Sequence, residues 1–158
     1  MNGILKNKLL LLLTLSLVVS AITSCKKYPE DKGIHLYRTA QNRLVGTWLV
    51  ASYSIDGADA TGAYADLNPA LAFTIKRNGD YTLYCDGFMI DKTGTKNPYI
   101  TNLAGTWQFL DKKKNLALTQ GTFSSNIDSY EIRKLTKTEL WLRQQKGILV
   151  TEIHYIAK

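Results

Sequence analysis

Histidines and cysteines are the residues of this chain best suited to nucleophilic or acid–base chemistry, and there are two of each. His35 lies in a polar stretch near the N-terminus, and His154 lies in an apolar run near the C-terminus. Neither histidine is paired in the sequence with a serine or cysteine nucleophile, so a catalytic triad has no support. Cys85 as a nucleophile needs a neighbouring base, and Asp86 is the only candidate beside it. We therefore expect no catalytic residues and a protein that is not an enzyme.

The acidic residues do not form a recognisable metal or cofactor site. Asp86, Asp91 and nearby hydroxyl groups could offer oxygen atoms to Ca²⁺, but the spacing of an EF-hand loop is missing. Residues 56–59 (Asp-Gly-Ala-Asp) are more typical of a turn than of a ligand loop. A glycine-rich phosphate loop is also missing from the sequence. We expect no bound metal and no cofactor.

Cys25 ends an N-terminal segment that has the features of a secretion signal. A basic start is followed by an apolar run from Leu9 to Val19, which is shorter than the ~20 residues of a spanning helix. Residues 22–25 (Ile-Thr-Ser-Cys) resemble the bacterial lipobox, in which an aliphatic residue and a small residue precede a cysteine. This resemblance implies cleavage between Ser24 and Cys25 and a diacylglycerol on the Cys25 sulfur. It also implies a lipid-anchored protein of the cell envelope, at the outer membrane on its periplasmic or cell-surface face. The alternative is an ordinary secretion signal with a cysteine near its cleavage site.

The predicted signal divides the chain into three parts: a signal peptide at 1–24, a lipidated cysteine and flexible tether at 25–42, and one domain at 43–158. Removing 24 residues from 158 leaves 134, with 18 basic and 13 acidic residues and a net charge of +5. The basic residues are scattered along the chain, so we expect no nucleic acid partner. With Cys25 lipidated, Cys85 has no disulfide partner and is expected to be a small buried apolar residue.

The domain reads as all-β. Runs rich in β-branched and aromatic residues alternate with turn residues, and no convincing amphipathic helix lies between them. The expected strands cover about 44–55, 71–76, 81–85, 105–110, 116–118, 127–135, 140–143 and 148–156, with polar loops at 58–69 and 87–102. About eight consecutive antiparallel strands favour an up-and-down barrel or half-open barrel, because closure removes the exposed strand edges.

The register of one hairpin can be predicted from its apolar pattern. A two-residue turn at Asn78-Gly79 would mix the two faces, whereas a three-residue loop with a left-handed Gly79 keeps them apart. This loop pairs Ile75 with Tyr81 and Phe73 with Leu83. It turns five side chains inward and three outward: Phe73, Ile75, Tyr81, Leu83 and Cys85 inward, and Thr74, Thr82 and Tyr84 outward.

Several short motifs in this domain are similar to those of lipocalin-like bacterial lipoproteins of the Bacteroidetes type. They are Gly46-Thr47-Trp48, the hairpin from Phe73 to Tyr81, Gly105-Thr106-Trp107 and the hairpin from Leu135 to Leu142. Asp128-Ser129-Tyr130 is a faint echo of the lipocalin T-D-Y motif, and a long C-terminal helix is missing. The resemblance implies a lipocalin-like barrel and does not imply a particular ligand.

Aromatic residues make up 10% of the chain and could line a cavity. The expected lining is Trp48, Phe73, Ile75, Tyr81, Leu83, Trp107 and Phe109, with Tyr53, Tyr64, Tyr84, Tyr99, Tyr130 and Trp141 as candidates for its mouth or for an outer contact surface. The expected function is binding of a small apolar or amphipathic molecule. The alternative is a non-enzymatic module that recruits another envelope protein and has a filled interior. An interior cavity of about 300 Å³ or more would favour the first of these functions.

Overall fold

The computed structural model describes residues 27–31, 39–121 and 127–158. The predicted signal peptide, its cleavage site at Ser24 and Cys25, and His35 lie outside the described residues. Within the described ranges, no helix is long and apolar enough to span a membrane.

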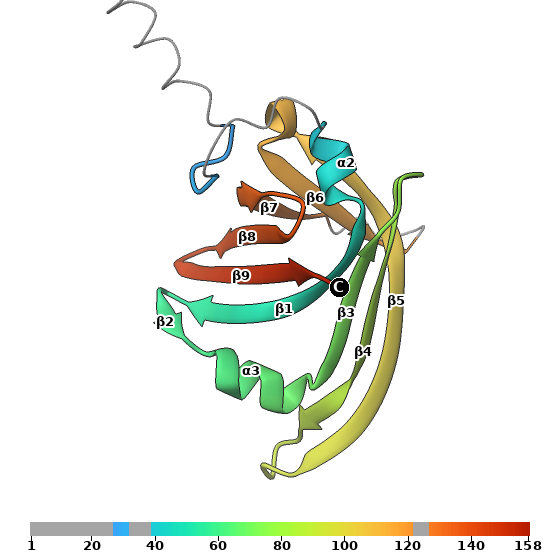
Figure 1. Ribbon diagram of the computed structural model, residues 1–158. Helices are drawn as coiled ribbons and strands as arrows, with labels where there is room; N and C mark the ends of the chain where they lie inside the picture. The colour runs from blue at the N-terminus through green and yellow to red at the C-terminus, as the bar shows by residue number, and fades with distance from the viewer. Residues whose placement is uncertain (1–26, 32–38, 122–126) are drawn as a thin grey trace, which may run out of the picture.

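Eight antiparallel strands form a closed barrel with up-and-down order, as the sequence predicts (Figure 1). Each strand pairs with the next along the chain, and pairing of β1 with β9 closes the barrel. A two-residue strand, β2, extends the end of β1, and two short helices lie at the ends of the barrel. The elements are α2 (Ala40–Leu44), β1 (Gly46–Ile55), β2 (Ala58–Asp59), α3 (Thr61–Leu67), β3 (Ala70–Ile75), β4 (Asp80–Ile90), β5 (Lys96–Leu110), the 3-10 turn η1 (Asp111–Lys113), β6 (Asn115–Gln120), β7 (Ile127–Leu135), β8 (Glu139–Lys146) and β9 (Leu149–Ala157).

The hairpin between β3 and β4 has the predicted register. Ile75 pairs with Tyr81 and Phe73 pairs with Leu83. Gly79 has a φ of 95°, in the left-handed region that favours glycine, and its carbonyl accepts a hydrogen bond from the Trp107 amide at 2.7 Å. The turn therefore sets the register of this hairpin and also contacts β5.

Three local predictions are wrong. Leu44 belongs to α2 rather than to the first strand, and the expected loop at 58–69 contains β2 and α3. Residues 87–102 are not a loop, because β4 continues to Ile90 and pairs there with Lys96 of β5. Asp91 makes this turn by accepting hydrogen bonds from the Thr93 and Thr95 amides, so the polar residues form only the hairpin tip. The apolar residues before and after that tip extend the strands.

The two ends of the barrel are covered differently, and we call them the α2 end and the α3 end (Figure 1). At the α2 end, Trp48, Leu44 and Leu135 are almost fully buried in the apolar core. Residues 27–31 pack against this end, with Tyr28 and Asp31 exposed by only 1% and 2%. The sequence analysis expected these residues to be an extended, mobile part of the tether. They instead pack on the barrel because Asp31 pairs with the buried Arg43, their atoms 3.3 Å apart.

Candidate functional site

The barrel interior contains a cavity of about 140 Å³. Seven strands, β3 to β9, contribute to its walls, which are mainly apolar and aromatic. The lining residues are Phe73, Tyr81, Leu83, Leu103, Leu118, Gln120, Asp128, Tyr130, Leu142 and Tyr155. Since successive residues of a strand face opposite sides, each strand offers every second side chain to this space.

The polar groups of the cavity gather toward the α3 end, where β6 ends at Gln120 and β7 begins near Asp128. Asp128 is half-buried, and its Oδ1 accepts a hydrogen bond from Gln144 Nε2 at 3.1 Å and lies 2.8 Å from Lys146 Nζ. Burial, and secondarily the Asp128 charge, raises the pKa of Tyr130 to about 12 and raises that of Tyr81. Both phenols therefore stay protonated at neutral pH and can donate hydrogen bonds.

More tyrosines surround this region of the interior. Burial, followed by the nearby Tyr64, raises the pKa of Tyr155. Tyr64, from α3, stacks on Tyr53 of β1 with ring centroids 4.4 Å apart, and burial raises its pKa to about 12. Phe73 contacts the ring of Tyr81 edge-on at 5.8 Å. The α3 half of the interior is thus aromatic and rich in hydroxyl groups.

The predicted lining residues divide into two groups. Phe73, Tyr81 and Leu83 line the cavity, whereas Trp48, Ile75, Trp107 and Phe109 lie outside its lining in the apolar core. The Trp48 indole nitrogen donates to the Leu44 carbonyl at 2.8 Å, and that of Trp107 donates to the Lys76 carbonyl at 2.8 Å. These indoles fill the α2 half because backbone carbonyls at that end satisfy their only polar group.

Most of the remaining lining was missed from the sequence. Tyr130 was considered only for the cavity mouth, and Leu103, Leu118, Gln120, Asp128, Leu142 and Tyr155 were not considered as lining. The alternation of Asp128, Tyr130 and Ile132 in β7 is the signal that could have found the first two of these three as cavity residues. Of the other aromatic candidates, Tyr84 points outward with 41% of its surface exposed.

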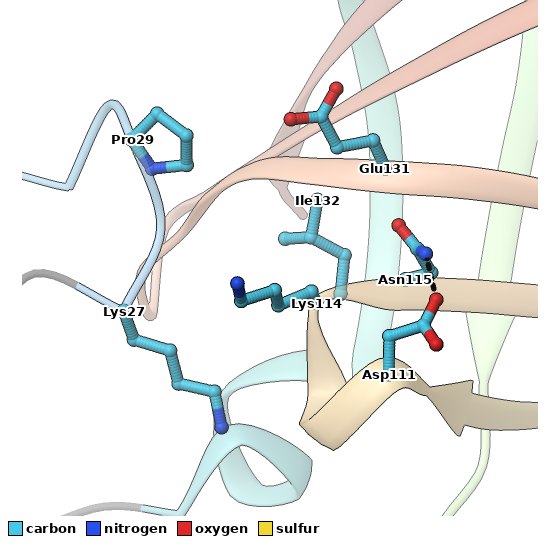
Figure 2. A pocket seen from close by; sticks show the side chains of 7 residues that line it. All are labelled: Lys27, Pro29, Asp111, Lys114, Asn115, Glu131 and Ile132. Carbon is cyan, nitrogen blue, oxygen red and sulfur yellow. Dashed lines mark hydrogen bonds between the residues drawn. The ribbon is translucent and has the colours of Figure 1, made fainter.

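A larger, open cleft of about 540 Å³ lies on the outside of the α2 end (Figure 2). It is lined by Lys27, Pro29, Asp111, Lys114, Asn115, Glu131 and Ile132. Figure 2 shows that residues 27–31 form one wall, and that Asn115 hydrogen-bonds to Asp111 on the other. Both signs of charge face this cleft, so it does not resemble a site for an apolar ligand.

The thiol and the imidazole in the described residues lie in structural environments. Cys85 is buried, and its sulfur lies 3.3 Å from Asn68 Oδ1 and 3.5 Å from the Tyr99 hydroxyl. His154 stacks on Trp141 with ring centroids 3.9 Å apart and lies 2.6 Å from Glu152 Oε1. Among the described residues, no cluster of His, Cys, Asp and Glu side chains could hold a metal ion.

Comparisons with known proteins add little to this description. No protein-family model matches the sequence, and no curated protein matches it significantly. Four chains of solved structures match the fold. One is a mutant of the fluorescent protein UnaG, which is 13% identical and has a TM-score of 0.37, with 73% of this chain and 96% of that chain covered.

Proposed function

We propose that this protein is a lipid-anchored lipoprotein of the cell envelope, at the outer membrane, whose barrel binds a small amphipathic molecule. In this proposal the lipid is attached to Cys25, and the domain is a binding protein rather than an enzyme. The observation that carries the binding function is the interior cavity, where apolar and aromatic walls meet polar groups at one end. This combination is typical of small-molecule sites.

The cavity volume limits the size of the ligand. A cavity of 140 Å³ falls short of the 300 Å³ that the sequence analysis set as its test and lies below the usual range of ligand sites. It is close to the roughly 150 Å³ of an engineered apolar cavity that binds benzene. We therefore propose a ligand whose buried part is about one ring, rather than a long acyl chain or a fused ring system.

The polar end suggests the chemistry of the ligand's other part. The Asp128 carboxylate accepts hydrogen bonds, and the protonated hydroxyls of Tyr81 and Tyr130 can donate them. A hydroxyl, amide or amine attached to a ring would match these groups, whereas a carboxylate would meet the charge of Asp128. Phenol-sized alcohols and amines are thus the proposed ligand class.

Binding of p-cresol and benzylamine, measured by calorimetry and by the rise in melting temperature, tests this proposal. We expect Leu118→Phe to abolish binding, because Leu118 lines the cavity and a larger side chain fills it. Thr119→Phe is the matched control, since this neighbour in β6 has the opposite side-chain direction. Binding that is unchanged in Leu118→Phe, or absent for both probes in the wild type, would overturn the proposal.

The lipid anchor has its own test. Metabolic labelling with a radioactive fatty acid should mark the wild-type protein, and Cys25→Ala should lose both the label and membrane retention. Equal labelling of the two proteins would refute lipidation of Cys25 without affecting the cavity.

A module that recruits another envelope protein is the second candidate, and the exposed apolar residues of the β4–β5 hairpin favour it. Met89, Ile90 and Ile100 are exposed by 58%, 55% and 71%. Exposed apolar patches often mark protein contacts. Ile90→Glu with Ile100→Glu should abolish cross-linking to such a partner while leaving binding of p-cresol unchanged. Cross-linking that persists in this variant would count against the second function.

A further inference from the structure

Exposed charges are distributed unequally between the two ends of the barrel. Basic residues gather in the turns and segments of the α2 end: Lys27, Arg77, Lys112, Lys113, Lys114 and Lys137. Aspartates gather on the elements of the α3 end: Asp56, Asp59, Asp66, Asp86 and Asp91. Glu30 and Asp111 at the first end, and Lys92, Lys96 and Lys146 at the other, are exceptions that reduce this difference without reversing it. The protein therefore has a basic end and an acidic end.

The contacts of α2 and residues 27–31 hold the basic segments together at one end. The Tyr28 hydroxyl donates to the Lys113 carbonyl at 3.0 Å, and Gln41 of α2 donates to the Arg77 carbonyl at 3.3 Å. Lys112 and Lys113 both have left-handed backbone conformations, with φ of 54° and 70°. All three lysines of residues 112–114 are exposed. Burial, and secondarily the charge of Lys113, lowers the pKa of Lys27. These lysines thus produce a positive field that an anionic surface would relieve.

The predicted lipid lies next to this basic end. Residues 27–31 are held by a hydrogen bond from the Glu30 amide to the Arg133 carbonyl at 2.9 Å and by the buried pair of Asp31 and Arg43. Cys25 precedes Lys27 by two residues, which span at most about 7 Å of chain. A lipid on Cys25 therefore brings the α2 end, and not the α3 end, to the bilayer surface.

We infer that the α2 end faces the membrane and that Lys27 and residues 112–114 bind the headgroups of anionic phospholipids. The position of the anchor in this inference rests on the proposed lipidation of Cys25, but the charge and the geometry of the basic end do not. The cavity residues Gln120 and Asp128 then lie toward the end that faces away from the bilayer, so the ligand enters from water. Each basic residue at an anionic surface strengthens membrane binding by about fivefold.

Binding of the unlipidated protein to vesicles tests this inference separately from lipidation. The mature chain from residue 25, carrying Cys25→Ala, keeps every described residue and is mixed with vesicles of phosphatidylcholine alone or with about 30% phosphatidylglycerol. We expect measurable binding only to the anionic vesicles. Lys112→Glu with Lys113→Glu should weaken it at least tenfold, and Lys27→Glu alone should weaken it about fivefold or more.

The matched control places the same charge change at the other end. Lys92→Glu with Lys96→Glu, at the tip of the β4–β5 hairpin, should leave binding within about twofold of the parent protein. Equal losses for the two double variants would overturn the assigned orientation, and so would equal binding to neutral and anionic vesicles. Failure of the fatty-acid labelling alone would instead refute the anchor and leave the basic lipid-binding end in place.

Discussion

Replacing Asp31 by alanine should strongly destabilise the domain, although the residue precedes the first strand by 15 positions. Asp31 Oδ2 lies 3.3 Å from Arg43 Nη1, and Oδ1 accepts a hydrogen bond from the Leu135 amide at 2.9 Å. The two charged side chains are exposed by only 2% and 6%. Removing one partner leaves a buried charge and a buried amide without their acceptor. Breaking such a pair costs about 3–5 kcal/mol of unfolding free energy, which corresponds to a fall in melting temperature of about 10–20 °C.

Urea unfolding of the mature protein, followed by tryptophan fluorescence, measures this loss. Glu30→Ala is the control within the same segment, because its ion pair with Arg133 is 43% and 24% exposed and should contribute less than about 1 kcal/mol. Asp31→Leu combined with Arg43→Met should recover most of the stability, since apolar side chains can replace a buried pair. If Asp31→Ala costs no more than Glu30→Ala, residues 27–31 do not pack on the barrel and the reasoning is refuted.

Other predictions concern the turns, the sheet and alkaline pH. Gly79→Val should cost about 1–2 kcal/mol or more by urea unfolding, because φ is 95° there; an unchanged midpoint would contradict the left-handed turn. Gly105→Ala should cost about 3 kcal/mol in the same assay, because its Cβ would lie 2.1 Å from the Thr119 carbonyl oxygen. Tyr64 and Tyr130 have pKa values of about 12, raised from 10.0, so stability should be constant below about pH 10 and fall between pH 10 and 12. Phenolate absorbance that titrates entirely near pH 10 would contradict this burial.

The parts of the fold that depend on neighbouring residues were predictable from the sequence. The Asn78-Gly79 turn and the apolar alternation around it determine a register that a one-residue slip would destroy. Successive hairpins without a helical crossover lead to an up-and-down barrel in the same way. In both cases the decisive signal lies within about ten residues of the feature that it predicts.

The missed parts depend on partners far away in the chain. Residues 27–31 have the charged, proline-containing composition of a linker, and the partner of Asp31 at Leu135 lies 104 positions later. The cavity was misjudged for a similar reason. Trp48 and Phe73 both face the interior, but a short helix and the first described residues complete the packing around Trp48, whereas Phe73 borders empty space. Alternation along the strands cannot distinguish a filled half of a barrel from a hollow one.

Pairing of β1 with β9 also determines when the domain can fold. Trp48 pairs with Ala157, and Ile55 pairs with Thr151, so the first strand needs the last residues of the chain. Until β9 is present, β1 and β8 each have an unpaired edge. For a chain exported from its N-terminus, as proposed here, closure must wait until the C-terminal strand has crossed the cytoplasmic membrane. The polypeptide therefore stays open enough to be threaded through a translocation channel, and its own final strand ends that period.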